Sequence, residues 1–210
     1  MELVIIGAGG FAKEIIFLVE RTNRFNVIGL IDDNYFNLPD NLLSYPLLGG
    51  IDYLKNLKKN TAVVIGISDP DVKRSIWDQL NKNDNLFFPN IVDDTALIGS
   101  EVSLGIGNII MAYTTFSANI KVGDFNMINI HSTIGHDTII KNFNSIYPAV
   151  NLSGNVHVGS GNEFGVGTKV IPGIDVGDDN KIGAGSVVIR NIKNKSKIVG
   201  VPAKIIESWD

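Results

Sequence analysis

The stretch INIHSTIGHDTIIKNFNSI, residues 128–146, places an isoleucine at every sixth position from Ile128 to Ile146. The same period continues without a slip on both sides, so that every sixth residue from Val92 to Val188 is aliphatic or phenylalanine. Glycine directly follows about half of these positions. An α-helix cannot keep a six-residue period on one face, because it has 3.6 residues per turn. The period therefore decides the fold of this part of the chain.

A six-residue period indicates a triangular coil. Each hexapeptide supplies one short flat strand and one corner, its large apolar residue points inward, and three hexapeptides close an 18-residue turn. We predict a parallel β-helix of roughly five turns with no large loop, since no repeat is interrupted. The last segment, NKSKIVGVPAKIIESWD (194–210), leaves the period and is expected to cap the final coil.

The first ninety residues follow a different pattern. Short apolar, β-branched runs at 3–7, 26–32 and 62–67 are typical of buried parallel strands. Apolar residues recur at helical spacing in 11–22 and in 69–80. We expect one half of a doubly wound α/β sheet, a half-Rossmann domain over residues 1–88, followed by the β-helix domain over residues 89–210.

The composition limits the classes of function. The net charge of −4 argues against a general nucleic-acid binder, and the absence of cysteine excludes disulfides and thiolate chemistry. No run of 18 apolar residues predicts a membrane span, and the N-terminus lacks the pattern of a secretory signal. We therefore expect a cytoplasmic protein that binds neither nucleic acid nor membrane.

GAGGFA (7–12) follows the first expected strand and opens a helix, and Asp32 and Asp33 end the second strand about 20 residues later. This is the pattern in which backbone N–H groups at a helix start hold phosphate and a carboxylate binds ribose or base donors. A dehydrogenase would need the second mononucleotide half, which the β-helix replaces. We expect a site for one nucleotide diphosphate; the alternative is that the glycines only form a tight turn.

The 18-residue turn also predicts the neighbours of the histidines. His136 should lie between Ala118 and Gly154, two small residues that leave room beside the imidazole. Asp137 follows directly, and a carboxylate beside an imidazole fixes its tautomer and raises its basicity. The pair is a candidate general base and its orienting acid; the alternative is a solvated surface histidine. His131 belongs to another column, for which a structural role is favoured, so the two histidines do not form a metal site.

The run from NIHSTIGHDTII through NLSGNVHVGSGNEFGVGTKVIPG to VGVPAK resembles the bacterial hexapeptide-repeat family that includes sialic acid O-acetyltransferases and nucleotide-sugar 4-amino N-acetyltransferases. The resemblance covers nearly the whole chain and implies a left-handed β-helix. By this resemblance His136 is the general base and Asp137 makes it more basic. The Gly154 N–H would bind the thioester oxygen, and Asn129 would line the active site.

The resemblance also implies contacts with acyl-CoA at Ser145, Val166 and Ala184. Ser145 stands where several members carry a second histidine. The segment 199–204 resembles the one that closes over CoA. Substrate contacts in the N-terminal domain would come from Gly9, Gly10, Phe11, Asp32, Asp33 and Gly66, with Phe11 replacing a frequent histidine.

These expectations combine into one leading hypothesis and three alternatives. The chain would transfer an acetyl group from acetyl-CoA to the amine of a UDP- or dTDP-linked 4-amino-4,6-dideoxy sugar in bacterial surface-glycan synthesis, without a metal. By the resemblance it would act as a homotrimer with acyl-CoA bound between subunits. The alternatives are O-acetylation of a sialic acid, a non-catalytic nucleotide-sugar-binding scaffold and, least favoured, an oxidoreductase.

Overall fold

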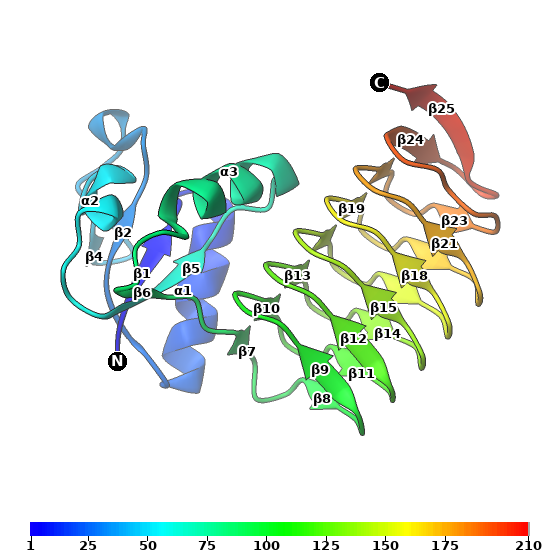
Figure 1. Ribbon diagram of the computed structural model, residues 1–210, viewed down its shortest axis with the longest axis horizontal. Helices are drawn as coiled ribbons and strands as arrows, with labels where there is room; N and C mark the ends of the chain where they lie inside the picture. Colours follow the sequence, from blue (N-terminus) through cyan, green and yellow to red (C-terminus); the bar gives the residue numbers. More distant parts are fainter. Residues whose placement is uncertain (210) are drawn as a thin grey trace. The chain divides into compact units, whose positions relative to one another are not determined.

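The computed structural model describes residues 1–209, which form two compact units, residues 1–91 and a second unit that starts at Val92 (Figure 1). The first is an α/β unit around a small parallel sheet, and the second is a β-solenoid with short strands stacked along its length.

The first unit has a four-stranded parallel sheet in the order β2-β1-β5-β6. Its strands are β1 (Glu2–Ile6), β2 (Asn26–Ile31), β5 (Thr61–Ile65) and β6 (Leu86–Phe87). The helices are α1 (Gly10–Thr22), α2 (Asp52–Lys55), α3 (Pro70–Leu80) and the 3-10 turn η1 (Tyr35–Asn37), and a small antiparallel hairpin joins β3 (Asn41–Leu42) to β4 (Tyr45–Pro46).

The three strands and two long helices expected from the sequence are all present. The apolar runs form β1, β2 and β5, whose side chains are almost entirely buried, as parallel strands require. Helix α3 begins where its sequence predicts: Asp69 caps it by accepting hydrogen bonds from the N–H groups of Asp71 and Val72, and Pro70 occupies the first turn.

The second unit is a three-sided parallel β-helix. We call its sides faces A, B and C, in chain order. Face A holds β7 (Ile91–Val92), β10 (Ile109–Ile110), β13 (Met127–Ile128), β16 (Ser145–Ile146), β19 (Glu163–Phe164), β22 (Lys181–Ile182), β24 (Ser196–Val199) and β25 (Lys204–Ser208). Face B holds β8 (Leu97–Ile98), β11 (Thr115–Phe116), β14 (Thr133–Ile134), β17 (Asn151–Leu152), β20 (Lys169–Val170) and β23 (Val187–Val188). Face C holds β9 (Val102–Leu104), β12 (Ile120–Val122), β15 (Ile139–Ile140), β18 (His157–Val158) and β21 (Asp175–Val176).

Stacked strands are offset by 18 residues, as in the pairing of Ile134 with Phe116 and with Leu152. The residues of the six-residue period form one continuous core. The first coil is the exception: Ile98 is 43% exposed, because it lies at the end of the stack with no coil of the β-helix beneath it. No loop interrupts the coils within the described residues, which confirms the prediction from the unbroken period.

The C-terminal segment caps the stack. Strand β24 pairs with β22 in parallel, but Lys181 meets Lys197, an offset of 16 rather than 18 residues. Strand β25 then turns back antiparallel to β24 and covers its edge (Figure 1). Covering the last strand satisfies backbone groups that an open sheet edge would leave unpaired.

Faces A and B meet at edge AB, faces B and C at edge BC, and faces C and A at edge CA. In the coil 129–146 these edges are residues 129–132, 135–138 and 141–144. The third residue of each of these corners is left-handed, with φ of 57° at His131, 60° at Asp137 and 60° at Phe143. Residues other than glycine seldom adopt this backbone conformation, so the surrounding coil must hold these three residues in it.

Edge CA contains a buried ladder of asparagines, one in each of five successive coils: Asn108, Asn126, Asn144, Asn162 and Asn180. From Asn108 to Asn162, the Oδ1 atom of each ladder residue accepts two hydrogen bonds from the next asparagine. One comes from its backbone N–H and the other from its Nδ2 group, at 2.9 to 3.1 Å. The ladder satisfies buried backbone groups at this edge and ties each coil to its neighbour.

Candidate active site

His136 and Asp137 form a direct pair on edge BC, between β14 and β15. The Nδ1 atom of His136 lies 2.7 Å from Oδ2 of Asp137. Because an ionised carboxylate only accepts hydrogen bonds, the proton of a neutral imidazole lies on Nδ1, which leaves the lone pair on Nε2. The side chains are 67% and 49% exposed. The pair thus has the arrangement of a general base and its orienting acid, and one chain alone leaves it open to solvent.

Asn119 holds the other oxygen of this carboxylate. Its Nδ2 group donates to Oδ1 of Asp137 at 2.6 Å, from the same corner position one coil earlier. The hydrogen bond with His136 and then that with Asn119 lower the pKa of Asp137 below its ordinary value. Sequence reasoning did not name Asn119, although the 18-residue offset that places Ala118 under His136 also places Asn119 under Asp137.

Gly154 lies directly beside the imidazole. A Cβ atom built on Gly154 would come within 2.5 Å of Nε2 of His136, so any side chain here would displace the ring. Glycine at this position therefore lets the ring lie over the backbone of the next coil. The backbone fixes the spacing between the coil of His136 and the coil of Gly154, since the Asn155 N–H donates to the carbonyl of His136 at 2.7 Å.

The residues expected to contact acyl-CoA lie on a different edge. Val166 and Ala184 occupy the same corner position of edge AB in successive coils, and the Gly185 N–H donates to the carbonyl of Val166 at 2.8 Å. Both side chains are exposed. Asn129 is also on edge AB, with Oδ1 accepting from the Ile130 N–H at 2.7 Å. In a single chain, face B therefore separates these residues from His136.

Ser145 differs from the rest of this set. It lies in β16 on face A, pairs with Met127 and Glu163, and is fully buried. The sequence could not reveal this burial, because residues that precede a core position are exposed in many other coils, as Thr133 and Ile139 are.

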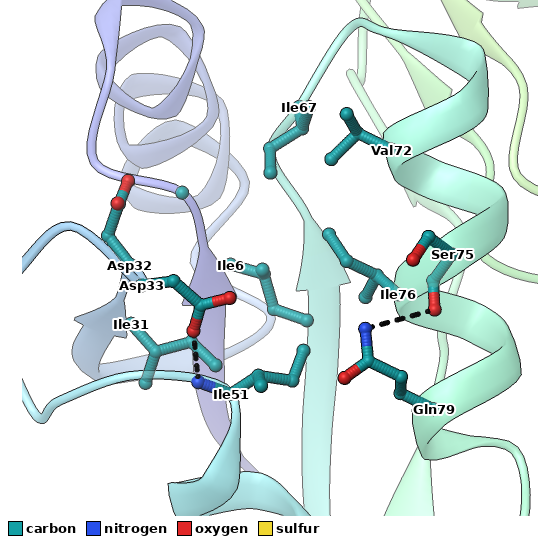
Figure 2. Close-up of a pocket in the computed structure, with 11 residues that line it drawn as sticks. Ile6, Ile31, Asp32, Asp33, Ile51, Ile67, Val72, Ser75, Ile76 and Gln79 are labelled. Atoms are coloured by element: carbon teal, nitrogen blue, oxygen red, sulfur yellow. Dashed lines mark hydrogen bonds between the residues drawn. The ribbon is translucent and has the colours of Figure 1, made fainter.

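In the N-terminal unit a cavity of ≈ 270 Å³ opens at the carboxyl ends of β1, β2 and β5, beside α3 (Figure 2). Asp32 and Asp33 contribute carboxylates, and branched apolar side chains form most of the remaining wall. Ser75 and Gln79, one turn apart on α3, also line it. The carboxyl edge of a parallel sheet is where ligands bind in open α/β folds.

The two carboxylates have different partners. Asp32 accepts from the Ala8 N–H and the Asn34 N–H, both at 2.9 Å, and so fixes the glycine turn. Asp33 accepts from the Ile51 N–H at 2.8 Å through Oδ1, the bond drawn in Figure 2. The second oxygen of Asp33 is the carboxylate atom of this cavity with no hydrogen bond to another of residues 1–209.

The glycines of this region fall into two groups. A Cβ atom on Gly9 or Gly10 would meet nothing within 4 Å, and both are exposed at the start of α1 beside the half-buried Phe11. Folding therefore does not require glycine at these two positions. Gly66 is buried, and a Cβ atom there would lie 2.9 Å from the Ile6 carbonyl oxygen, so packing alone accounts for it. Gly9, Gly10, Phe11 and Gly66 do not line the cavity that Asp32 and Asp33 share.

Among residues 1–209, no group of three or more His, Cys, Asp or Glu side chains is arranged to hold a metal ion. None of the described helices has the length and apolar character needed to cross a membrane.

Comparison with known proteins gives matches to both units. Residues 2–80 match the family model of the PglD N-terminal domain. A variant of perosamine N-acetyltransferase from Caulobacter crescentus, solved with CoA and GDP-perosamine, is 29% identical, with 99% of this chain and 98% of that chain covered and a TM-score of 0.88. The chain is a β-helix acetyltransferase with a PglD-like N-terminal domain.

Other solved structures show how far the architecture of this acetyltransferase extends. WeeI from Acinetobacter baumannii is 27% identical, with 98% of this chain and 100% of that chain covered and a TM-score of 0.88. The acetyltransferase domain of PglB from Neisseria gonorrhoeae is 24% identical, with 98% and 99% covered and a TM-score of 0.92, which shows a shared fold. A search of curated proteins gave no match.

Proposed function

We propose that this acetyltransferase moves the acetyl group of acetyl-CoA to the amine of a nucleotide-linked 4-amino-4,6-dideoxy sugar. The observation that carries the proposal is the His136–Asp137 pair, in which Nδ1 lies 2.7 Å from Oδ2, with the imidazole lying over Gly154. The complex of the perosamine N-acetyltransferase with CoA and GDP-perosamine supports the substrate class. We expect UDP or dTDP as the nucleotide. Because that relative is solved with a GDP-linked sugar, GDP is tested beside them.

The proposed reaction uses His136 as the base. The sugar amine attacks the thioester carbon, and Nε2 of His136 accepts the proton that the amine loses. Asp137 holds Nδ1 and stabilises the imidazolium that forms. The Gly154 N–H, which donates no hydrogen bond to another of residues 1–209, would stabilise the oxyanion. The C–S bond then breaks, and the His136 imidazolium passes its proton to the sulfur, so that CoA leaves as the free thiol and the imidazole is neutral again. No step of this scheme requires a metal ion.

The acyl donor and the nucleotide of the acceptor would bind to separate units. Val166 and Ala184 on edge AB would contact acetyl-CoA. Asp33 and the glycine turn at Gly9 and Gly10 would hold the nucleotide, with Asp32 fixing the turn. The proposal assigns no contact to the buried side chain of Ser145 and treats Gly66 as a packing residue.

We propose a homotrimer, because it would bring these residues into one site. If face B of three chains turned toward a common threefold axis, edge AB of each chain would meet edge BC of the next. Face B suits this role, because its outward strand residues within the described chain carry one charge: Leu97, Thr115, Thr133, Asn151, Lys169 and Val187. The acyl donor on edge AB of one chain would then lie beside His136 of its neighbour.

The test is a screen of acceptors with acetyl-CoA, following release of the CoA thiol and acetylation by mass spectrometry. UDP-, dTDP- and GDP-linked 4-amino-4,6-dideoxy sugars are compared with their 4-hydroxy analogues and with sialic acids. The proposal expects acetylation of an amino sugar and none of its hydroxy analogue. Acetylation of sialic acid alone, or binding of nucleotide sugar without any acetyl transfer, would contradict it.

A further inference from the structure

Two aromatic rings stack on edge AB. The rings of Tyr113 and His131 have centroids 5.2 Å apart and planes inclined by 16°. Both residues are exposed, and both have left-handed backbones, with φ of 58° and 57°. Other corners of the β-helix share this backbone at their third residue, as at Asp137 and Phe143, so what distinguishes the pair is the exposure of its two rings.

A second stacked pair in the same molecule provides a comparison. Phe125 and Phe143 occupy the corresponding corner positions of edge CA, with centroids 5.4 Å apart and the same left-handed backbone. Phe125 is buried, and the pair is apolar. On edge CA, a stack whose role is packing is thus built from two phenylalanines. The polar, exposed rings on edge AB need another explanation.

The coil above leaves the His131 ring uncovered. The next residue in its column is Ala149, followed by Gly167 and Gly185. A Cβ atom on either glycine would meet nothing within 4 Å. The Nδ2 group of the neighbouring Asn129 donates no hydrogen bond to another of residues 1–209, although the residue is 5% exposed. An aromatic face and an unused amide donor therefore lie together.

We propose that Tyr113, His131 and the Asn129 amide bind the sugar ring of the acceptor in the active site of a neighbouring subunit. This rests on the proposed function and its trimer. A threefold axis parallel to the β-helix keeps each residue at its own height, and His131 lies in the same coil as His136. The rings thus face the base of the next chain, where a deoxy sugar presents an apolar face to stack and hydroxyls to bond.

The positions of Tyr113 and His131 along the β-helix axis favour the acceptor, and not the acyl donor, as their ligand. Val166 lies two coils above His131, and Ala184 three coils above, whereas Tyr113 lies one coil below. If acetyl-CoA reaches the site from the upper coils, the amine must attack the thioester from the other side. The Tyr113 and His131 rings are on that side.

Steady-state kinetics of four variants test the assignment. His131→Asn and Tyr113→Asn remove one ring each and place a residue that tolerates positive φ. Tyr113→Phe keeps the stack, and Phe143→Asn removes a ring from the other stacked pair. We expect His131→Asn and Tyr113→Asn each to raise the acceptor KM about tenfold, the size expected when the contact of an apolar sugar face with one aromatic ring is lost. The KM for acetyl-CoA should change less than twofold in both.

The controls exclude a purely structural effect. Tyr113→Phe should keep most of the acceptor affinity, and Phe143→Asn should lower the melting temperature and leave both KM values unchanged. An unchanged acceptor KM in His131→Asn, or a rise in the acetyl-CoA KM alone, overturns the assignment. Equal effects of Phe143→Asn and His131→Asn on the acceptor KM overturn it too.

Two further measurements separate this inference from the proposed function. Addition of the nucleotide sugar should shift the NMR signals of the His131 ring even in an inactive His136→Ala protein; no shift contradicts the inference. With acceptor well below the wild-type KM, where His131→Asn is about tenfold impaired, an equal mixture of His131→Asn and His136→Ala chains should form about a quarter of its interfaces from two intact edges and recover about a quarter of the wild-type activity. No recovery despite subunit exchange contradicts the placement between chains. A wild type that transfers acetyl to no acceptor would instead refute the proposed function.

Discussion

The chemistry proposed for this chain depends on one imidazole and the three groups around it. Asp137 fixes Nδ1 of His136, Asn119 holds the carboxylate from the coil below, and Gly154 leaves room for the ring. All three come from the 18-residue offset or from the adjacent position in sequence. A small change at any of them therefore alters the orientation or basicity of a single atom, Nε2, and leaves the core of the coil unchanged.

Replacement of His136 should remove most of the activity and none of the fold. We expect His136→Ala to lower kcat by about two to four orders of magnitude, the usual contribution of a positioned base. The side chain is exposed, so the circular dichroism spectrum and melting temperature should match those of the wild type. A variant that keeps more than about a tenth of the wild-type kcat would show that the base lies elsewhere.

The lowered pKa of Asp137 predicts a pH effect with a definite sign. Because its folded pKa lies below its unfolded value, the stability it contributes is present above the ordinary carboxyl pKa and is lost as the pH falls through the folded pKa. Asn119→Ala removes one of the two hydrogen bonds and should raise the Asp137 pKa toward its ordinary value. NMR titration of the carboxyl carbon measures this, with Asn155→Ala as the control. An unchanged titration would contradict the role of Asn119.

At the scale of the element, the six-residue period was sufficient to predict the coils, their offset and the vertical neighbours of His136. It could not predict the asparagine ladder on edge CA, because an asparagine in a turn is equally common when it is exposed. It also gave no sign that Ser145 is buried. The period reports which side chains point inward, whereas hydrogen bonding and burial depend on what covers the outer positions.

The ladder should contribute strongly to stability. Asn144 donates to the Asn126 side chain and to the Gly159 carbonyl, and accepts from Asn162. Asn144→Ala leaves buried backbone groups without partners and should lower the free energy of unfolding by about 2–3 kcal/mol. The control is Asn191→Ala, whose two bonds to Asp175 are exposed and lie away from face B, and should together contribute less than about 1 kcal/mol. Urea denaturation checks both; equal losses would refute a special role for the ladder.

The nucleotide site is an element-scale prediction for the N-terminal unit. Gly9 has room for a Cβ atom, and Asp33 is exposed at the cavity, so Gly9→Val with Asp33→Ala should fold. We expect the double variant to bind nucleotide sugar at least tenfold more weakly, through the lost carboxylate and the blocked approach to the helix start. Calorimetry should show unchanged acetyl-CoA binding. An equal loss for both ligands would contradict separate sites.

At the scale of the whole molecule, the sequence predicts two units with different periods, but the proposed active site needs residues from more than one chain. His136 lies on edge BC, while Asn129, Val166 and Ala184 lie on edge AB of the same β-helix. Spacing along the sequence can assign each residue to a column. It cannot show that two columns on opposite borders of a face belong to one site, because that requires the symmetry of an assembly.

The proposed homotrimer, joined around face B, would bring these two edges together, and a charge placed on that face should break it. Thr133 is an exposed strand residue of face B whose stacked neighbours, Thr115 and Asn151, carry no charge. In Thr133→Glu, three carboxylates would meet near the threefold axis, where like charges repel. Light scattering should then report a monomer with little transferase activity. Ile139→Glu places the same charge in the same coil on face C and should remain an active trimer. A wild type that is fully active as a monomer would refute this assembly, as would an active trimeric Thr133→Glu variant.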